Sequence, residues 1–306
     1  MNSNKFYSNG KLLLTGEYAV LDGALALAIP TKFGQLLEIN SIDKPKIIWK
    51  SFDETDAIWF ESNFAIENIG NETKAPNNIE DRLIQILCSA RSLNPRFLSD
   101  NQGYQATTKL TFPKHWGLGT SSTLINNIAQ WAQVDPYKLL ELTFGGSGYD
   151  IACAKNNTPI TYQLASNNKE KRVAKSVDFN PSFKENIFFV YLNKKQNSRE
   201  GIKHYHANKQ NATSCIKDIN LITEKVISCK NLEDFEYLID KHENIIGDLT
   251  NQTPIKRLLF NDYKGSIKSL GAWGGDFIMV TSRTNPEAYF KEKGFNTIIP
   301  YEKMVL

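Results

Sequence analysis

The chain has 306 residues, of which 36 are basic and 33 acidic, giving a formal net charge of +3. This near balance excludes the strongly basic surface that is typical of dedicated nucleic-acid-binding proteins. Hydrophobic residues make up 41% of the chain and charged residues 23%, proportions that predict a globular protein, and the length predicts two domains.

Apolar segments and cysteines indicate the cellular compartment. The longest apolar runs, residues 24–29 and 187–192, have six residues each, whereas a membrane-spanning helix needs about 20. The start of the chain contains only a short apolar run, which is too short for a secretory signal. The four cysteines show no CxxC spacing, which is typical of free, buried thiols in a reducing compartment. We therefore expect a cytoplasmic protein without a membrane-spanning segment.

Strand signals dominate the first half of the chain. Asp22-Gly23 predicts a turn between the apolar segments 17–21 and 24–29, and Pro30 is expected to end the second segment. The composition predicts further strands at 33–39, within 43–78, at 105–112, at 187–192 and at 276–281.

Helices are expected between and after these strands. Apolar residues at helical spacing predict helices at 79–93, 120–133, 211–228 and 232–248. Asp135-Pro136 is a helix start signal, so another helix is expected from there to about residue 144. Helices and strands do not alternate regularly, which predicts an α+β fold with antiparallel sheets. The polar segment 166–186 is the predicted junction between an N-terminal domain, 1–170, and a C-terminal domain, 185–306.

Residues 113–122, PKHWGLGTSS, place two glycines directly before a predicted helix. Glycine lets the backbone approach an anion closely, and a helix start points unpaired N–H groups toward it. A hydroxyl beside a bound phosphate is also a suitable magnesium ligand. The alternative is an ordinary glycine turn with a Ser/Thr cap. The segment is not a dinucleotide-binding fingerprint, because the third glycine is missing.

Three further glycine-rich segments are GKLLLTGEYAVL (10–21), GGSGYDIA (145–152) and LGAWGGD (270–276). Lys11 can place a positive charge near a substrate, and Asp150 can act as a catalytic carboxylate in a tight loop. Leu12 follows Lys11, so the first segment is not a Walker A loop. Taken one at a time, the ordinary interpretations are favoured: a surface lysine on an edge strand, a turn aspartate and a flexible loop.

Taken together and in this order, the four segments resemble the motifs of the GHMP kinase superfamily, which includes galactokinase, homoserine kinase, mevalonate kinase and phosphomevalonate kinase. GKLLLTGEYAVL is similar to the first motif, PKHWGLGTSST to the central motif and GAWGGD to the third. SGYDIA is similar to the SGxDxA segment of mevalonate-type members, and GYDIA to the signature of a bacterial subgroup. GEYAVL and GGD look most like phosphomevalonate kinases. The resemblance spans residues 10–276.

The resemblance implies a two-domain fold, with a ribosomal S5 domain 2-like N-terminal domain and a ferredoxin-like C-terminal domain. It implies ATP and Mg²⁺ as cofactors, and phosphoryl transfer to an acceptor of the mevalonate or 5-phosphomevalonate type. Asp150 would be the catalytic base and Lys11 its partner, while Ser121 and Glu141 would bind Mg²⁺. The implied nucleotide-binding residues are Gly117, Leu118, Gly119, Thr120, Ser121 and Ser122. The implied substrate-binding residues are Glu17, Tyr18, Ser147, Gly148 and Gly274.

Three positions depart from the family pattern. Tyr18 replaces the commoner histidine of the first motif. Trp273 stands where the third motif usually has a small residue, and Glu141 precedes Asp150 by nine residues where eleven are expected. Alternatives are a diphosphomevalonate decarboxylase-like enzyme on the same scaffold and a nucleotide-binding or ligand-binding homologue without turnover. RNA binding by the S5-like domain is disfavoured by the balanced charge.

Partners and metal sites complete the expectations. We expect a small-molecule substrate and no nucleic-acid or membrane partner. The sequence does not decide between a monomer and a homodimer. His204 and His206 have a spacing that can chelate a metal on a strand. No third ligand is nearby in the sequence, so an exposed loop is favoured there.

Overall fold

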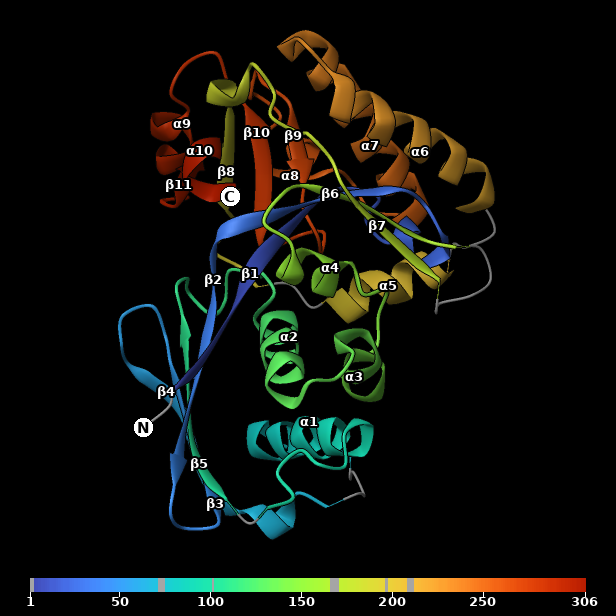
Figure 1. Cartoon of the computed structure of the whole chain (residues 1–306). Helices are drawn as coiled ribbons and strands as arrows, with labels where there is room; N and C mark the ends of the chain where they lie inside the picture. Colours follow the sequence, from blue (N-terminus) through green and yellow to red (C-terminus); the bar gives the residue numbers. More distant parts are fainter. Residues whose placement is uncertain (1–2, 71–74, 101, 166–170, 196–197, 208–211) are drawn as a thin grey trace. The chain divides into compact units, whose positions relative to one another are not determined.

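A computed structural model describes residues 3–70, 75–100, 102–165, 171–195, 198–207 and 212–306 (Figure 1). The chain divides into two compact units, and neither is one continuous segment. Unit 1 comprises residues 1–10, 33–114 and 119–155, and unit 2 comprises residues 11–32, 115–118 and 156–306. The division into domains 1–170 and 185–306 stays a prediction, and part of the expected junction, 166–170, lies outside the described residues.

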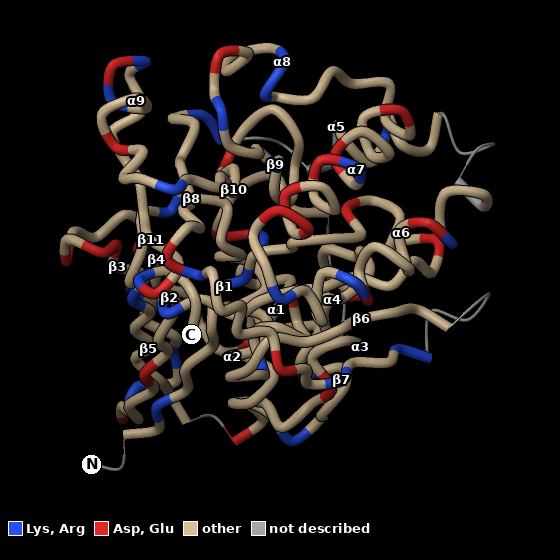
Figure 2. Tube along the Cα trace, turned by 90° about the horizontal axis from the view of Figure 1, so that it is seen from above, with Lys and Arg blue, Asp and Glu red and all other residues tan. Residues whose placement is uncertain are grey.

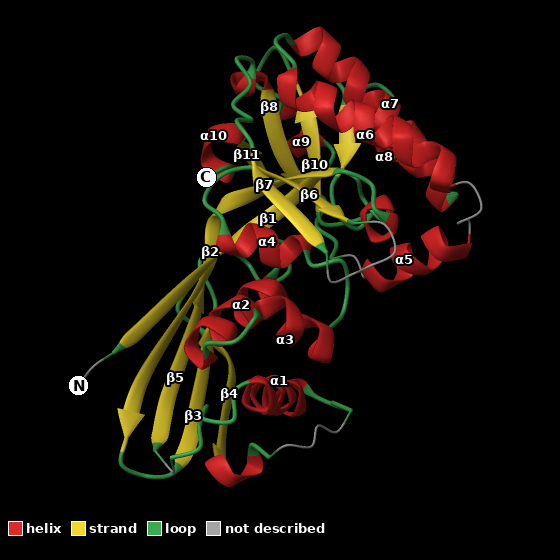
Figure 3. Ribbon diagram, turned by 45° about the vertical axis from the view of Figure 1, so that its right-hand side comes forward, coloured by secondary structure: helices red, strands yellow, loops and turns green. Residues whose placement is uncertain are grey.

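Unit 1 is a sheet with helices packed on one face (Figure 3). Strand β3 (Lys46–Phe52) pairs antiparallel with β4 (Ile58–Ala65) and parallel with β5 (Gly103–Leu110). Strand β5 pairs antiparallel with residues 35–42 of β2 (Ala26–Ile42).

The helices of unit 1 are α1 (Ile79–Leu93), α2 (Thr120–Ala132), α3 (Pro136–Thr143) and α4 (Tyr149–Lys155). Helix α2 packs against the other three. A single hydrophobic core joins sheet residues such as Trp49 and Ala106 to helix residues such as Ile86 and Ile128. This core fixes the starts of α2 and α4, which carry predicted site residues.

Unit 2 contains an antiparallel sheet in the order β11-β8-β10-β9. Its strands are β8 (Ile187–Tyr191), β9 (Ile267–Ser269), β10 (Phe277–Thr281) and β11 (Ile298–Pro300). A second group of strands consists of residues 26–28 of β2, β6 (Ile160–Leu164) and β7 (Arg172–Ser176). Strand β1 (Asn4–Thr15) enters unit 2 at Lys11 and leads into the short 3-10 helix η1 (Ala19–Asp22).

The helices of unit 2 are α5 (Ser198–Ala207), α6 (Ala212–Ser228), α7 (Leu232–Thr250), α8 (Ile255–Leu259), α9 (Glu287–Glu292) and α10 (Tyr301–Met304). Helix α7 packs against β9 and against α5 and α6. The long helices α6 and α7 run side by side (Figure 1). Short 3-10 turns lie at Ile66–Asn68 in unit 1 and at Lys184–Asn186 in unit 2.

The predicted helices and the α+β class are confirmed. Helix α1 has the predicted bounds, and α2, α6 and α7 differ from prediction by one or two residues. The Asp135 side chain accepts a hydrogen bond from the Tyr137 N–H, so Asp135 caps α3 as expected. The strand pairs are antiparallel except for β3 with β5 among those whose register is described.

Two local predictions were wrong. Strand β2 continues through Pro30, which lies between the stretch that pairs with β6 and the stretch that pairs with β5. His204 and His206 lie on α5 rather than in an exposed loop, and residues two apart on a helix do not face one ligand.

Acidic and basic residues are interspersed along the described trace (Figure 2). No helix of the described residues is long and apolar enough to cross a membrane. All four cysteines are free; Cys88 and Cys153 are buried as predicted, whereas Cys215 and Cys229 are partly exposed.

Candidate active site

The start of α2, in unit 1, is shaped by Gly119. This residue adopts a left-handed backbone with φ of 97°, which favours glycine, and the helix begins directly after it at Thr120. No side chain caps the helix start. The first N–H groups of α2 are therefore left for a ligand, and with the positive end of the helix dipole they suit an anion.

The hydroxyl groups at this helix start differ in their surroundings. Ser122 donates its hydroxyl to the Gly119 carbonyl at 2.9 Å, and Thr123 donates to the Gln35 side-chain oxygen at 2.7 Å. The Ser121 side chain is exposed, and its hydroxyl has no hydrogen-bond partner among the described residues. The Ser121 hydroxyl is thus accessible to a ligand or a metal ion, whereas those of Ser122 and Thr123 are engaged.

Asp150 lies in the first turn of α4. The loop before this helix contains Gly145, Gly146 and Gly148, all with positive φ values between 69° and 103°. Because α4 packs against α2, unit 1 brings the helix that carries Asp150 together with the helix that carries Ser121.

Glu141 is exposed on α3, and no group of three acidic, histidine or cysteine side chains suited to a metal occurs among the described residues. Serine, carboxylate and phosphate oxygens fit Mg²⁺ chemically, because this ion uses few protein ligands and completes its shell with substrate phosphates and water. Ser121 and Glu141 as metal ligands stay predictions.

Unit 2 joins the first motif to the first half of the central motif. The Lys11 backbone N–H donates to the Leu118 carbonyl at 3.0 Å, and its Nζ donates to the Gly117 carbonyl at 3.3 Å. The lysine of the first motif is therefore held beside the glycine segment that precedes α2.

Asp276, the last residue of the third motif, faces this segment. A Cβ placed on Gly117 would lie 2.4 Å from the Asp276 carboxyl group. Asp276 itself has φ of 52°, an uncommon value outside glycine. Lys11, Gly117 and Asp276 line one small cavity together with Gly271 and Phe277. Sequence reasoning did not single out Asp276, although it ends the GAWGGD segment.

Aromatic rings surround the same segment. Trp116 packs edge-on against Phe277, with ring centroids 5.3 Å apart, and Tyr191 lies 5.3 Å from the His115 ring. His115 thus packs against an aromatic ring beside this segment.

Tyr18 of the first motif is joined to Trp273 of the third. The Trp273 backbone N–H donates to the Tyr18 hydroxyl at 3.0 Å, and the Tyr18 ring stacks on Tyr205. The Trp273 side chain is buried in the same hydrophobic cluster, with Ile219 and Ile246. The large residue at the usual small position therefore forms part of the core of unit 2. Burial raises the pKa of Tyr18 to about 12, so its phenol is neutral near pH 7.

Glu17 belongs to a fully buried ionic cluster, which we call the Lys268 cluster and define as Glu17, Lys268, Glu243 and His242. The Lys268 ammonium donates to Glu17 and lies 3.8 Å from Glu243. His242 Nε2 accepts the Gly16 N–H at 2.9 Å. Sequence reasoning missed Lys268, Glu243 and His242. The one signal is that His242 interrupts the apolar stripe of α7.

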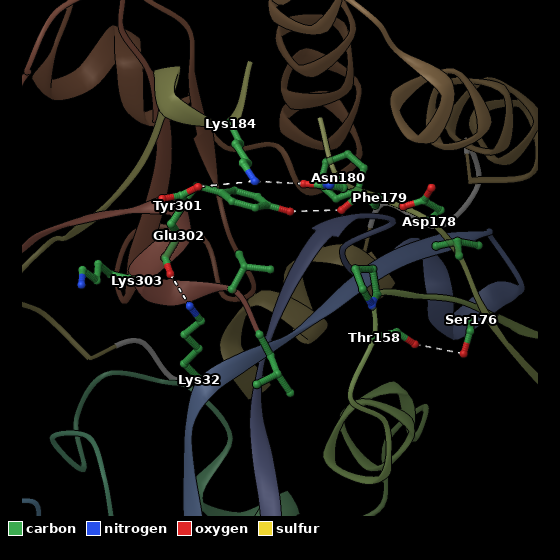
Figure 4. A pocket seen from close by; sticks show the side chains of 14 residues that line it. Lys32, Thr158, Ser176, Asp178, Phe179, Asn180, Lys184, Tyr301, Glu302 and Lys303 are labelled. Atoms are coloured by element: carbon green, nitrogen blue, oxygen red, sulfur yellow. Dashed lines mark hydrogen bonds and ion pairs between the residues drawn. The ribbon is translucent and has the colours of Figure 1, made fainter. Parts of the chain in front are cut away.

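A pocket of about 820 Å³ in unit 2 is lined by none of the predicted site residues (Figure 4). Lys32 donates to the Glu302 carbonyl at 2.6 Å, and Lys184 lies between Glu302 and Asn180. Its lysines, Lys32, Lys184 and Lys303, are offset by Asp178 and Glu302, so the pocket shows no strong preference for one sign of charge.

The predicted site residues fall in both units. Unit 1 contains Gly119, Thr120, Ser121, Ser122, Glu141, Ser147, Gly148 and Asp150, and unit 2 contains Lys11, Glu17, Tyr18, Gly117, Leu118 and Gly274. Because Asp150 and Lys11 lie in different units, their pairing stays a prediction.

No family model matches the chain, and no curated protein matches it in sequence. Solved structures do match. Mevalonate kinase from Methanococcus jannaschii superposes with a TM-score of 0.74 at 18% identity, covering 97% of both chains. Phosphomevalonate kinase from Streptococcus pneumoniae, in complex with phosphomevalonate and AMPPNP, gives 0.69 at 17% identity and covers 96% of both chains.

A structure with another activity also matches. Mevalonate diphosphate decarboxylase from Staphylococcus aureus gives a TM-score of 0.60 at 11% identity, covering 95% of this chain and 91% of that one. Likeness at these identities establishes architecture rather than chemistry. The predicted fold is confirmed: this chain has the fold that the mevalonate kinase, phosphomevalonate kinase and decarboxylase structures share.

Proposed function

We propose that this protein transfers the γ-phosphoryl group of ATP to a small acceptor of the mevalonate or 5-phosphomevalonate type. The observation that carries the proposal is the uncapped start of α2, where left-handed Gly119 precedes exposed Ser121. Such a helix start suits a polyphosphate. The fold adds support, because one structure that shares it was solved with phosphomevalonate and AMPPNP.

The nucleotide would be held mainly by backbone groups. The N–H groups of Gly119 to Ser122 bind its phosphates, and Gly117 and Leu118 form the approach to the helix. The Ser121 hydroxyl and the Glu141 carboxylate would bind Mg²⁺, which neutralises phosphate charge when it is present. Ser122 is a weaker candidate ligand because its hydroxyl is already engaged with Gly119.

Phosphoryl transfer passes through a loose transition state, so catalysis depends mainly on positioning and on electrostatic stabilisation. Asp150 accepts the proton of a hydroxyl acceptor as general base. Lys11 keeps Asp150 ionised and neutralises charge on the migrating group. If the acceptor is itself a phosphate, it is already ionised and Asp150 orients it.

The acceptor would be bound by Tyr18 of the first motif, Ser147 and Gly148 of the GGSGYDIA segment and Gly274 of the third motif. The neutral phenol of Tyr18 can donate a hydrogen bond to the acceptor, whereas the buried Glu17 side chain acts through its neighbours.

ADP release tests the proposal. The protein is incubated with Mg-ATP and, one at a time, mevalonate, 5-phosphomevalonate, homoserine and galactose. We expect acceptor-dependent ADP release with one of the first two and its loss in Asp150→Asn. Release of CO₂ from mevalonate diphosphate would instead identify a decarboxylase. Binding of Mg-ATP without any turnover would identify a ligand-binding homologue.

A further inference from the structure

We propose that Lys268 is a positioning residue, which holds Glu17 and through it Tyr18 of the first motif against the loop of the third motif. The inference rests on the proposed kinase function only for its effect on the acceptor. The structural part concerns unit 2 alone and can be tested without turnover.

The contacts of Lys268 connect three segments that are far apart in the sequence. Its ammonium donates to the Glu17 carboxylate and, at 3.0 Å, to the Ser269 carbonyl. Glu243, on α7, accepts hydrogen bonds from the Ser269 N–H at 3.1 Å and from its hydroxyl at 2.7 Å. Ser269 is the last residue of β9 and is followed by the third motif. One buried cation thus ties the first motif to the start of the third.

The burial of this cluster is costly. The side chains of Glu17, Lys268 and His242 are fully buried, and that of Glu243 is 4% exposed. Burial raises the pKa of both carboxyl groups and holds the pKa of His242 well below its usual range. A buried ion pair is weak evidence for net stability, since desolvation offsets the attraction. Fixing one geometry is the better-supported role for such a cluster.

The geometry that it fixes is unusual. Tyr18 directly follows Glu17 and has φ of 57° and ψ of −47°, a strained backbone for a residue with a side chain. Its ring end is confined as well, because a Cβ on Gly201 of α5 would lie 2.2 Å from the Tyr18 hydroxyl. The Trp273 N–H also donates a hydrogen bond to that hydroxyl. Tyr18 is thus held at its backbone by the Lys268 cluster and at its ring by α5 and the third motif.

Loss of the Lys268 charge should therefore release Tyr18 rather than the nucleotide. Glu17 would no longer accept a hydrogen bond from the Lys268 ammonium. The strained turn at Tyr18 would then relax. The acceptor contact of Tyr18 would weaken, so the KM of the acceptor should rise. ATP binding, which we assign to the start of α2, should change little.

Two variants separate positioning from stability. Lys268→Met leaves two buried carboxyl groups without their cation and is expected to be less stable. Glu17→Gln combined with Lys268→Met removes both charges at similar volume and should recover much of that stability. Thr281→Val, at a buried position in the same sheet, removes the hydroxyl that accepts the Ser266 N–H and so controls for a general loss of stability.

Hydrogen exchange read by mass spectrometry is the first measurement, on the full-length protein. We expect faster exchange at residues 16–23 and 270–275 in both Lys268 variants, with unchanged exchange in α2 and no such change in Thr281→Val. If the double variant keeps wild-type exchange in both segments, Lys268 does not position Tyr18.

Kinetics are the second measurement. We expect the acceptor KM to rise about tenfold or more in both Lys268 variants, while the Kd of ATP stays within about twofold. A double variant with wild-type acceptor KM would overturn the inference even if the kinase proposal holds. Conversely, if the wild type transfers no phosphoryl group, the kinase proposal fails, while the exchange result still decides the positioning role.

Discussion

A Cβ on Gly117 would overlap the carboxyl group of Asp276, so a side chain at this position fits only if Asp276 moves. Asp276 also belongs to the third motif, and both residues line a cavity with Lys11. Residues from three motifs therefore meet within unit 2. Two of them, Gly117 and Asp276, have positive φ values that the local sequence must accommodate.

Gly117→Ala should destabilise the protein more than Gly145→Ala does. The two glycines have nearly the same φ, 70° and 69°, so the backbone strain is matched at about 1–3 kcal/mol. A Cβ on Gly145 meets open space, whereas one on Gly117 meets Asp276. Chemical denaturation measures the difference. Gly117→Ala should regain stability when Asp276→Gly is added, and equal losses in the two single variants would contradict the packing argument.

Ser121→Ala should raise the Mg²⁺ concentration needed for half-maximal phosphoryl transfer more than Ser122→Ala or Thr120→Ala does. The reason is that the Ser121 hydroxyl is exposed, whereas that of Ser122 is bonded to the Gly119 carbonyl. Magnesium titrations at fixed ATP measure the effect. A larger effect of either neighbouring substitution would show that the motif has been matched in the wrong register.

Asp150→Asn should leave ATP binding intact and lower kcat with a hydroxyl acceptor by about 10²–10⁴-fold, the usual cost of losing a general base. Lys11→Met should also lower kcat. If the two residues act as a unit, the double variant loses less than the product of the single losses. Steady-state kinetics of the three variants provide the comparison. Wild-type kcat in Asp150→Asn would remove Asp150 as the base.

Glu243 should make the stability of the protein depend on pH. Burial raises the pKa of its carboxyl group from 4.5 to about 7. A group whose pKa is raised by folding binds its proton more tightly in the native state, so its contribution is full below about pH 4.5 and is lost as the pH rises through about 7. This shift corresponds to a loss on the order of 3 kcal/mol.

Denaturation curves at pH 5 and pH 8 measure this dependence. In Glu243→Gln, the free energy of unfolding should fall less between pH 5 and pH 8 than it does in the wild type. Glu292→Gln, at the exposed last residue of α9, serves as control. An unchanged decrease in Glu243→Gln would show that other groups set the pH dependence.

Local sequence signals predicted the helices whose starts and buried faces are determined by neighbouring residues. Asp135-Pro136 located α3 and its cap, and apolar spacing located α1 with its bounds. Gly119 was expected to precede a helix and does so. The prediction at Pro30 was wrong because the effect of a proline in a strand depends on which strands pair beside it. Those strands, β5 and β6, lie far away in the sequence.

The Lys268 cluster could not be predicted in the same way. Glu17 and Lys268 are 251 residues apart, and each alone is compatible with an exposed charge. Only the packing of α7 and β9 brings Glu243 and Lys268 to Glu17. Likewise, Trp273 looked like a departure from the third motif, and its role in the core of unit 2 appears only with Tyr18 and Ile219 around it.

The most direct test of the proposed function is to identify the product. The protein is incubated with ATP, Mg²⁺ and either mevalonate or 5-phosphomevalonate, and the acceptor is analysed by mass spectrometry together with the ADP formed. The account predicts that one of these acceptors gains a single phosphoryl group for each ADP released, and that Asp150→Asn slows this gain by about 10²–10⁴-fold when the acceptor is mevalonate. An unmodified acceptor in both reactions, with Mg-ATP bound to a folded protein, would contradict it.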